Sequence, residues 1–250
     1  DLDLLKAINQ RAWVGVVYSI SSLDPALKQA FEPHSPGVRG RLQAMVTLAE
    51  AGILVGTALM PVLPFVGEDA AHLEAVIRAT KDHGGSFVIG GGLTMDGIQA
   101  QRTLEAYRRF DPVMAPRLRE MYNWQSNGKP SYNPPKAYSA RLGLRIRALC
   151  ERHGLFDRMP RYIEPGSLAV NKRVAERLFL RTYDLELEQA ADYRIWAYRK
   201  AAWTVDEWPE PVDALYETRG ETGLRTLPNV GESIAGRIAG WLQDEEADLE

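Results

Sequence analysis

The sequence has 250 residues, of which 45% are hydrophobic and 25% are charged, so it can bury one large core or a medium core with an appended domain. Its single cysteine, Cys150, excludes an internal disulfide and any metal site that needs several cysteines of this chain. The charge is unevenly spread, because residues 101–188 carry a basic excess and residues 189–250 an acidic excess.

The sequence shows no sign of a membrane partner. The long uncharged stretch 51–67 is interrupted by Pro61 and Pro64, and it is too short for a membrane span. We therefore expect a cytoplasmic protein. The chain lacks a starting methionine and begins inside a helical pattern at residues 2–8, so we expect an excerpt of a longer protein.

Three strand-and-helix repeats are predicted in the first part of the chain. Apolar, β-rich runs occupy 13–20, 53–64 and 86–93, and each is followed by a helical pattern. Strands joined by helical crossovers must lie parallel. Because a three-stranded parallel sheet leaves an open edge, we expect a partial barrel with further strands upstream. Ligand-binding groups are then expected in the loops that follow the strands, 19–36 and 61–69.

Strand patterns cease at Pro112, and helices follow. The pattern over about 138–153 places Cys150 on an apolar helical face, and Asn171 is predicted to cap a helix that ends near Leu187. In the last 60 residues we predict helices over 190–203, 212–220, 224–227 and 232–242, with a tight hairpin at 228–231 and Gly220 as a C-cap.

These patterns predict an α/β fold followed by helical regions. The domain boundaries are predicted at 1–111 for the α/β part, 112–188 for a basic helical extension and 189–250 for a small all-α domain.

Residues 1 to about 188 resemble the C-terminal part of radical S-adenosylmethionine (SAM) proteins of the spore photoproduct lyase, or DNA repair photolyase-like, type. The resemblance rests on an ordered series of short segments: Val17 to Ile20, Phe31 to Pro33, Arg41-Leu42, Gly56 and Pro61. It implies a partial radical SAM barrel that uses SAM and a [4Fe-4S] cluster in lyase-like radical chemistry on DNA or another small or nucleotide substrate.

The same resemblance implies four cofactor contacts. Ser19 would lie near SAM, Arg41 would pair with the SAM carboxylate, Glu32 would anchor Arg41 or its loop, and Gly56 would let the chain pass close to the adenine. For Ser19 the alternative is an ordinary strand-end hydroxyl, and for Arg41 it is a surface arginine. No catalytic residue and no metal ligand is assigned.

The cluster of this family needs three cysteine thiolates after the first strand, and this chain has no such triplet. Either the cysteines lie upstream of Asp1 or the domain has lost its chemistry. As given, the chain is expected to be inactive, and a non-catalytic nucleic-acid- or protein-binding module is the alternative function.

Residues 189–247 resemble the helix-hairpin-helix domain at the amino end of family X DNA polymerases, through segments 197–202, 215–216 and 224–238. The resemblance implies that backbone N–H groups of the hairpin bind a DNA phosphate, and it assigns nucleic-acid contacts to Asn229, Val230, Gly231 and Arg237.

Two features of the hairpin depart from that family. Asn229 replaces its first glycine, and asparagine tolerates the left-handed backbone that the turn needs. Glu232 stands where a basic residue is common, so we expect weak DNA affinity, and a protein contact remains an alternative. Four residues of the preceding helix are expected in the core: Ile195, Trp196, Ala202 and Trp203.

Overall fold

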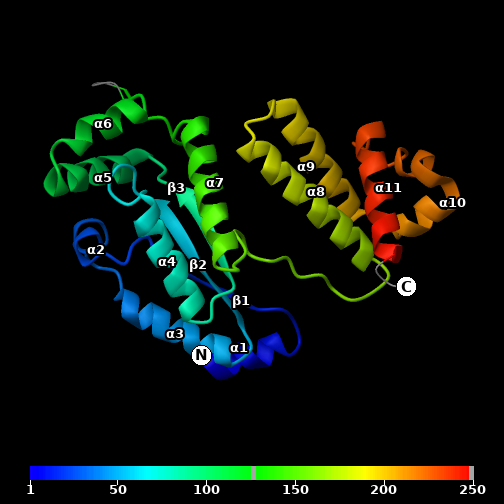
Figure 1. Cartoon of the computed structure of the whole chain (residues 1–250), viewed down its shortest axis with the longest axis horizontal. Coiled ribbons are helices and arrows are strands. Elements are labelled where there is room, and N and C mark those ends of the chain that lie inside the picture. Colours follow the sequence, from blue (N-terminus) through cyan, green and yellow to red (C-terminus); the bar gives the residue numbers. More distant parts are fainter. Residues whose placement is uncertain (125–127, 248–250) are drawn as a thin grey trace. The chain divides into compact units, whose positions relative to one another are not determined.

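The computed structural model describes residues 1–124 and 128–247, without the side chains of 245–247. The chain forms two compact units, Asp1–Pro160 and Arg161–Glu250, which we call the α/β unit and the helical unit (Figure 1). The division falls inside the stretch that the sequence assigned to a basic extension. The boundaries predicted near 111 and 188 remain predictions.

The α/β unit is built on a parallel sheet, as predicted. Its strands, β1 (Gly15–Ser19), β2 (Leu54–Val62) and β3 (Phe87–Gly92), lie in the order β1-β2-β3, and both pairs are parallel. Ser19 is in register with Ala58, and Gly56 is in register with Phe87. The carboxyl ends of the three strands therefore lie at one edge of the sheet.

Helices alternate with the strands and then follow them: α1 (Leu2–Asn9), α2 (Pro25–Phe31), α3 (Val38–Glu50), α4 (Ala70–Asp82), α5 (Gly97–Phe110), α6 (Met114–Met121) and α7 (Lys136–Arg152). Aspartate side chains cap two of these helices. Asp24 accepts from the backbone N–H of Ala26, and Asp69 accepts from that of His72. These bonds fix where α2 and α4 begin.

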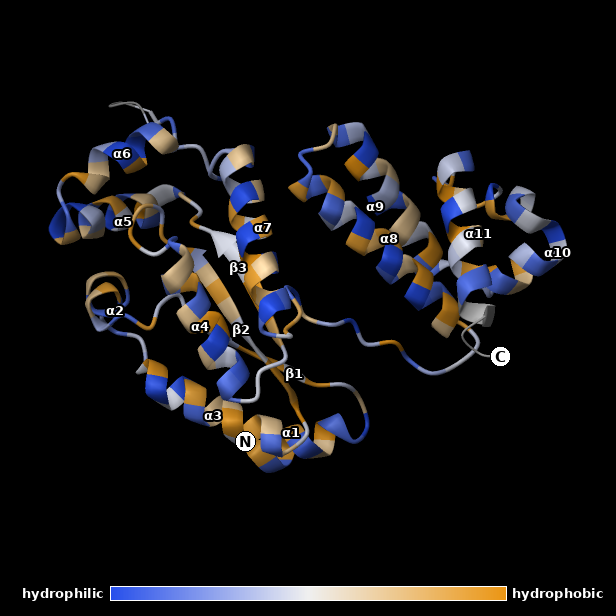
Figure 2. Ribbon diagram, viewed as in Figure 1, coloured by the Kyte–Doolittle hydropathy of each residue, from blue (hydrophilic) through white to orange (hydrophobic). Residues whose placement is uncertain are grey.

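One face of the sheet is covered by helices. Leu59 and Val88 pack against Ile77 of α4 and Ile146 of α7 in a single buried cluster, while Val55 packs with Met45 of α3. Figure 2 shows hydrophobic residues along the strands and along helical stripes beside them. This cluster includes the apolar face of α7, with Cys150, that the sequence predicted.

The expected radical SAM barrel is not shown by this structure. Within residues 1–124 and 128–247 the sheet has three strands and is open, and no described strand pairs with the outer edge of β1. The outer edge of β3 is bridged by one residue, Phe156, which pairs with Phe87. The fold that the structure does establish is a mixed α/β unit followed by a helical unit.

The helical unit contains α8 (Ala169–Leu187), α9 (Asp192–Glu207), α10 (Val212–Leu224) and α11 (Glu232–Ala247). All four helices contribute to one hydrophobic core, for example through Leu178, Tyr198, Leu224 and Ile238. The sequence placed α8 outside this domain, but its buried face is part of the same core.

Asn171 does not cap α8, contrary to the sequence-based prediction. It lies inside the helix and is fully buried. Its side-chain NH₂ donates to the carbonyls of Trp208, at 3.0 Å, and Glu210, at 2.8 Å. Its side-chain oxygen accepts from the N–H of Val212 at 2.9 Å. Asn171 therefore holds the connection between α9 and α10 against α8.

The chain before the hairpin also differs from the prediction. Gly220 has a positive φ of 58° and a non-helical backbone, so the first helical segment of α10 ends there as predicted, and a second segment continues to Leu224. The short helix predicted over 224–227 is wrong, since residues 225–227 form a turn. The hairpin at 228–231 and the start of the next helix at Glu232 are as predicted.

Candidate functional site

Arg41 ties the end of β1 to the loop that precedes α3. Its Nη1 donates to the backbone carbonyl of Ser19. Its Nη2 donates to the carbonyl of Pro36, at 2.6 Å, and to the hydroxyl of Ser35, at 2.9 Å. Ser19 and Arg41, both predicted from the sequence to lie in the site, are therefore in direct contact.

Glu32 belongs to the same network. Its carboxylate lies 3.6 Å from Nη2 of Arg41 and accepts hydrogen bonds from the hydroxyls of Ser21, at 2.5 Å, and Ser35, at 3.1 Å. The Arg41 side chain is only 12% exposed, and its Nε is buried without a partner among the described residues. The two Nη groups thus donate three hydrogen bonds within the protein, which leaves Nε and the second N–H of Nη1 as donors.

A second feature of this region is the sheet face opposite α4 and α7. Because side chains alternate along a strand, the register places Val17 and Ser19 on the same face as Gly56, Ala58 and Met60. Val17 is 38% exposed, and Ser19, Ala58 and Met60 are exposed or partly exposed. Parallel sheets normally have both faces covered, so this face is a candidate binding surface.

Gly56 shares that face with Ser19, but it has a packing role of its own. A Cβ atom added at Gly56 would lie 2.6 Å from the ring of Phe87 on the neighbouring strand. The absence of a side chain at Gly56 is therefore explained without a cofactor, and Gly56 is not part of the Arg41 network.

The residues present do not fit an iron–sulfur cluster. Cys150 is fully buried in α7, and burial raises the pKa of its thiol to about 12, so the thiolate that binds iron is disfavoured. Among the described residues no group of three or more His, Cys, Asp or Glu side chains is arranged to hold a metal ion.

The hairpin between α10 and α11 forms the candidate nucleic-acid interface. Asn229 has φ 63°, the left-handed conformation that the sequence required of it. The carbonyl of Gly231 accepts from the N–H groups of Ile234 and Ala235, so α11 starts directly after Gly231. A Cβ at Gly231 would meet no atom within 4 Å, which leaves the helix start open to a ligand.

The other two predicted contacts lie in different surroundings. Val230 is buried in the core of the helical unit, so only its backbone is available to a ligand. Arg237 lies on the exposed side of α11, with its guanidinium carbon 5.9 Å from the ring centroid of Tyr198.

Arg237 lies near two other cations, Arg181 and Arg194, that the sequence did not single out. Arg181 of α8 donates to both oxygens of Glu188, at 2.7 and 3.3 Å. These bonds, with the nearby charges of Arg194 and Arg237, hold the pKa of Glu188 below its ordinary value. The helices thus gather three arginines from distant parts of the sequence. Their spacing along the chain carries no periodic signal.

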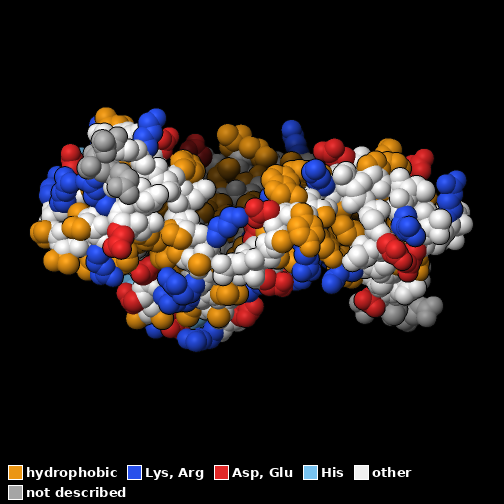
Figure 3. Space-filling view, turned by 90° about the horizontal axis from the view of Figure 1, so that it is seen from above, with side chains coloured by type: hydrophobic (Ala, Val, Ile, Leu, Met, Phe, Trp, Pro, Cys, Tyr) orange, Lys and Arg blue, Asp and Glu red, His pale blue; other side chains and the backbone are white. Residues whose placement is uncertain are grey.

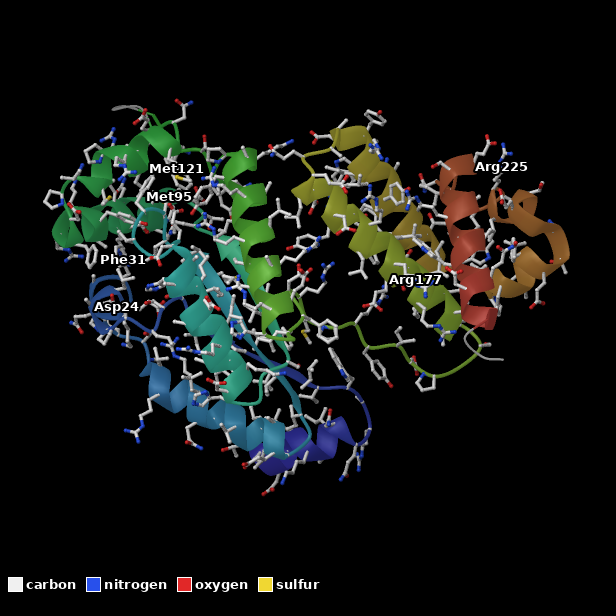
Figure 4. All side chains as sticks on the ribbon, viewed as in Figure 1. Asp24, Phe31, Met95, Met121, Arg177 and Arg225 are labelled. Carbon is white, nitrogen blue, oxygen red and sulfur yellow. The ribbon has the colours of Figure 1, made fainter. Side chains whose placement is uncertain are left out.

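Two further arginines of this unit, Arg225 and Arg177, differ in their surroundings (Figure 4). Arg225 is exposed and lies three residues before the hairpin, where its charge is available to a ligand. Arg177 instead serves the fold, because its Nη1 donates to the carbonyl of Trp241 at 3.3 Å and links α8 to α11.

Residues 170–247 match the helix-hairpin-helix domain family. This span contains α8 to α11, so the helical unit carries a helix-hairpin-helix domain. The sequence placed the start of this domain at residue 189, whereas the match begins in the first turn of α8.

The chain is also similar to uncharacterized proteins of Mycobacterium tuberculosis and Mycobacterium bovis. Each is 26% identical over 155 residues, which is 62% of this chain and 44% of the relative. The chain therefore spans less than half the length of these curated relatives. No solved structure matches the chain. None of the described helices is both long and apolar enough to cross a membrane.

Proposed function

We propose that this protein binds nucleic acid through its helix-hairpin-helix domain, with a backbone phosphate at the hairpin between α10 and α11. The observation that carries the proposal is the geometry at the start of α11, within a span that matches this domain family. Asn229 turns the chain with a left-handed backbone, and Gly231 leaves the first turn of the helix uncovered.

The chemistry of this site is that of a helix N-terminus. The first N–H groups of an α-helix have no partner within the helix, and the helix dipole makes this end favourable for an anion. Residues 231–233 are exposed, so their N–H groups can donate to phosphate oxygens. Arg225 and Arg237 add positive charge on either side in the sequence.

Glu232 opposes this binding. Its carboxylate is exposed in the first turn of α11, and the domain around it is acidic overall. A phosphate therefore meets a repulsive charge close to its donors, and the affinity should be low and sensitive to salt.

Fluorescence anisotropy of the full chain with a labelled DNA duplex tests this function. We expect micromolar or weaker binding at about 50 mM salt, because few phosphates are contacted, and weaker binding at about 200 mM, because each phosphate contact releases counterions. Absence of binding at the lowest salt would remove the proposal and leave a protein-contact role for the domain.

A second proposal concerns the α/β unit. We propose that it forms part of the SAM-binding barrel of a longer, cytoplasmic radical SAM enzyme with lyase-like activity. Two observations favour this reading: the network of Ser19, Arg41 and Glu32 at the carboxyl end of β1, and the exposed face of the parallel sheet beside it.

In such an enzyme the cluster and SAM supply a radical, whereas the residues of this chain shape the SAM site. Arg41 holds the loop between α2 and α3 against the end of β1, and the second N–H of Nη1 and the buried Nε are the donors left for a carboxylate. Because Cys150 cannot serve the cluster, no step through the cluster follows from this chain. A non-catalytic degenerate barrel remains the competing reading.

Titration calorimetry of this chain with SAM distinguishes a SAM-binding barrel from a degenerate barrel. It measures binding and needs no enzymatic activity. We expect measurable binding that Arg41→Lys weakens, because lysine lacks the planar fork that links Ser19 to the loop. Arg39→Lys, on an exposed position of the same helix, is the matched control. Equal affinity of all three proteins would remove Arg41 from the site, and no SAM binding would favour the degenerate barrel.

A further inference from the structure

The solvent face of α9 carries three large aromatic side chains. Tyr193 is 76% exposed, and Trp196 and Trp203 are each 46% exposed. Their spacing places them on one side of the helix, together with the exposed Lys200. The sequence-based expectation that both tryptophans belong to the core is therefore wrong, although it is confirmed for Ile195 and Ala202.

The fold does not require these rings. The opposite face of α9, with Tyr198, Ala201 and Val205, is buried in the core and anchors the helix. Trp196 and Trp203 lie side by side on the outside, with ring centroids 6.2 Å apart and ring planes inclined by 58°. Figure 3 shows hydrophobic side chains gathered on the exposed surface around α8 and α9. Exposed aromatic groups of this kind are typical of interaction sites.

The local charge indicates what this face would bind. Between Tyr193 and Trp203 the helix carries Arg194, Arg199 and Lys200 and no acidic residue, although the domain as a whole is acidic and Arg199 is paired with Glu186 of α8. The guanidinium carbon of Arg199 lies 4.8 Å from the ring centroid of Trp196. Aromatic rings interleaved with cations suit a polyanion that presents flat aromatic groups.

The aromatic face leads to the hairpin. Thr204 directly follows Trp203, and its hydroxyl accepts a hydrogen bond of 3.2 Å from the side-chain NH₂ of Asn229. The hairpin is therefore attached to the end of α9 that carries Trp203. The rings from Tyr193 to Trp203 extend over about 15 Å of helix, given the rise per residue of an α-helix.

We propose that the face of α9 formed by Tyr193, Trp196, Lys200 and Trp203 is a stacking platform for the bases of single-stranded nucleic acid. Bases in a duplex are paired and stacked on one another, so rings on a helix surface can stack only on unpaired bases. The proposal rests on the proposed function of the same domain. It adds that the preferred ligand is a single strand, or a single strand that continues from a duplex held at the hairpin.

The test uses the full chain and two labelled probes, an oligothymidylate of about 12 nucleotides and a duplex of the same length. We expect the double variant Trp196→Ala/Trp203→Ala to bind the single strand at least about 10-fold more weakly, since each stacked base contributes about 1–3 kcal/mol. Duplex binding should stay unchanged. Alanine favours helix at exposed positions, and circular dichroism checks that α9 is intact.

Two controls make the result specific to stacking. The double variant Trp196→Phe/Trp203→Phe retains flat rings and should keep most of the affinity for the single strand. Tyr162→Ala removes a ring that is also 46% exposed but lies outside the matched domain, and it should have no effect.

Three outcomes would overturn the platform. Unchanged single-strand binding by the Trp→Ala double variant, with duplex binding intact, removes the platform and leaves the proposed function standing. A concentration-dependent dimer that the same variant abolishes, without any effect on single-strand binding, assigns the face to a second copy of the chain. If the wild-type chain binds neither probe, both the platform and the proposed function are wrong.

Discussion

The side-chain NH₂ of Asn229 donates a 3.2 Å hydrogen bond to the hydroxyl of Thr204, and this bond fastens the hairpin to α9. Asn229 also has a positive φ of 63°. One residue thus provides both the turn and its attachment.

Asn229→Ala should therefore lose both contributions. We expect it to lower the free energy of unfolding by about 1–2 kcal/mol, because alanine is strained in the left-handed region. Asn229→Gly should cost less, since glycine adopts that backbone freely and loses only the exposed hydrogen bond. Urea unfolding of the two variants checks the order, and a larger loss for glycine would contradict it.

Asn171 should be among the most sensitive polar positions of the helical unit. Asn171→Ala removes one buried and two partly buried hydrogen bonds and leaves the carbonyls of Trp208 and Glu210 without this donor. We expect a loss of about 1–3 kcal/mol in the free energy of unfolding. Asn9→Ala, which removes largely exposed bonds of the same kind, is the control and should cost less.

Substitution of Gly56 tests whether this glycine is needed for packing of the sheet or for contact with a cofactor. The Cβ of Gly56→Ala would lie 2.6 Å from the Phe87 ring, so we expect a destabilisation of about 1–3 kcal/mol in the absence of any ligand. Gly40→Ala is the matched control, because its Cβ meets nothing within 4 Å on an exposed position of α3. It should stabilise the protein by about 0.5–1 kcal/mol. Thermal unfolding that shows no loss for Gly56→Ala would contradict the packing account.

The lowered pKa of Asp157 should make the free energy of unfolding depend on pH. Burial alone would raise its pKa, but hydrogen bonds of 3.0 Å from Arg147 and 2.9 Å from Arg158 outweigh burial and hold the pKa below its ordinary value of 3.8. A carboxyl group with a lowered pKa adds stability above its unfolded-state pKa, and this stability disappears as the pH falls through the folded-state pKa.

Asp157→Asn should therefore be less stable than the wild type at neutral pH, by about 1–3 kcal/mol, and the difference should shrink below about pH 4. Urea unfolding at several pH values measures this difference. Asp82→Asn, at the exposed end of α4, should show no such convergence. A difference that stays constant from neutral to acid pH would contradict the role of the Asp157 carboxylate.

Local patterns predicted much of this molecule. The apolar runs and their helical connections indicated the parallel sheet. The left-handed backbone of Asn229 followed from the residue type and the hairpin pattern.

What the sequence missed depends on tertiary contacts. Asn171 has the residue type of a cap, but its partners are at Trp208, Glu210 and Val212, distant in the chain. Trp196 and Trp203 were placed in the core because of their hydrophobicity, yet the core of the helical unit is filled from the other face of α9. Which side of a helix is covered is decided by its neighbours.

The most direct test of nucleic-acid binding at the hairpin compares Gly231→Asp with Gly231→Asn. Both side chains fit the open position, and both are good N-cap residues that should preserve the start of α11. They differ by one negative charge placed where the phosphate would lie. In anisotropy titrations of the full chain with a labelled duplex at low salt, we expect the Asp variant to bind at least about 10-fold more weakly than the Asn variant. Equal binding by the two variants would contradict a phosphate site at the hairpin.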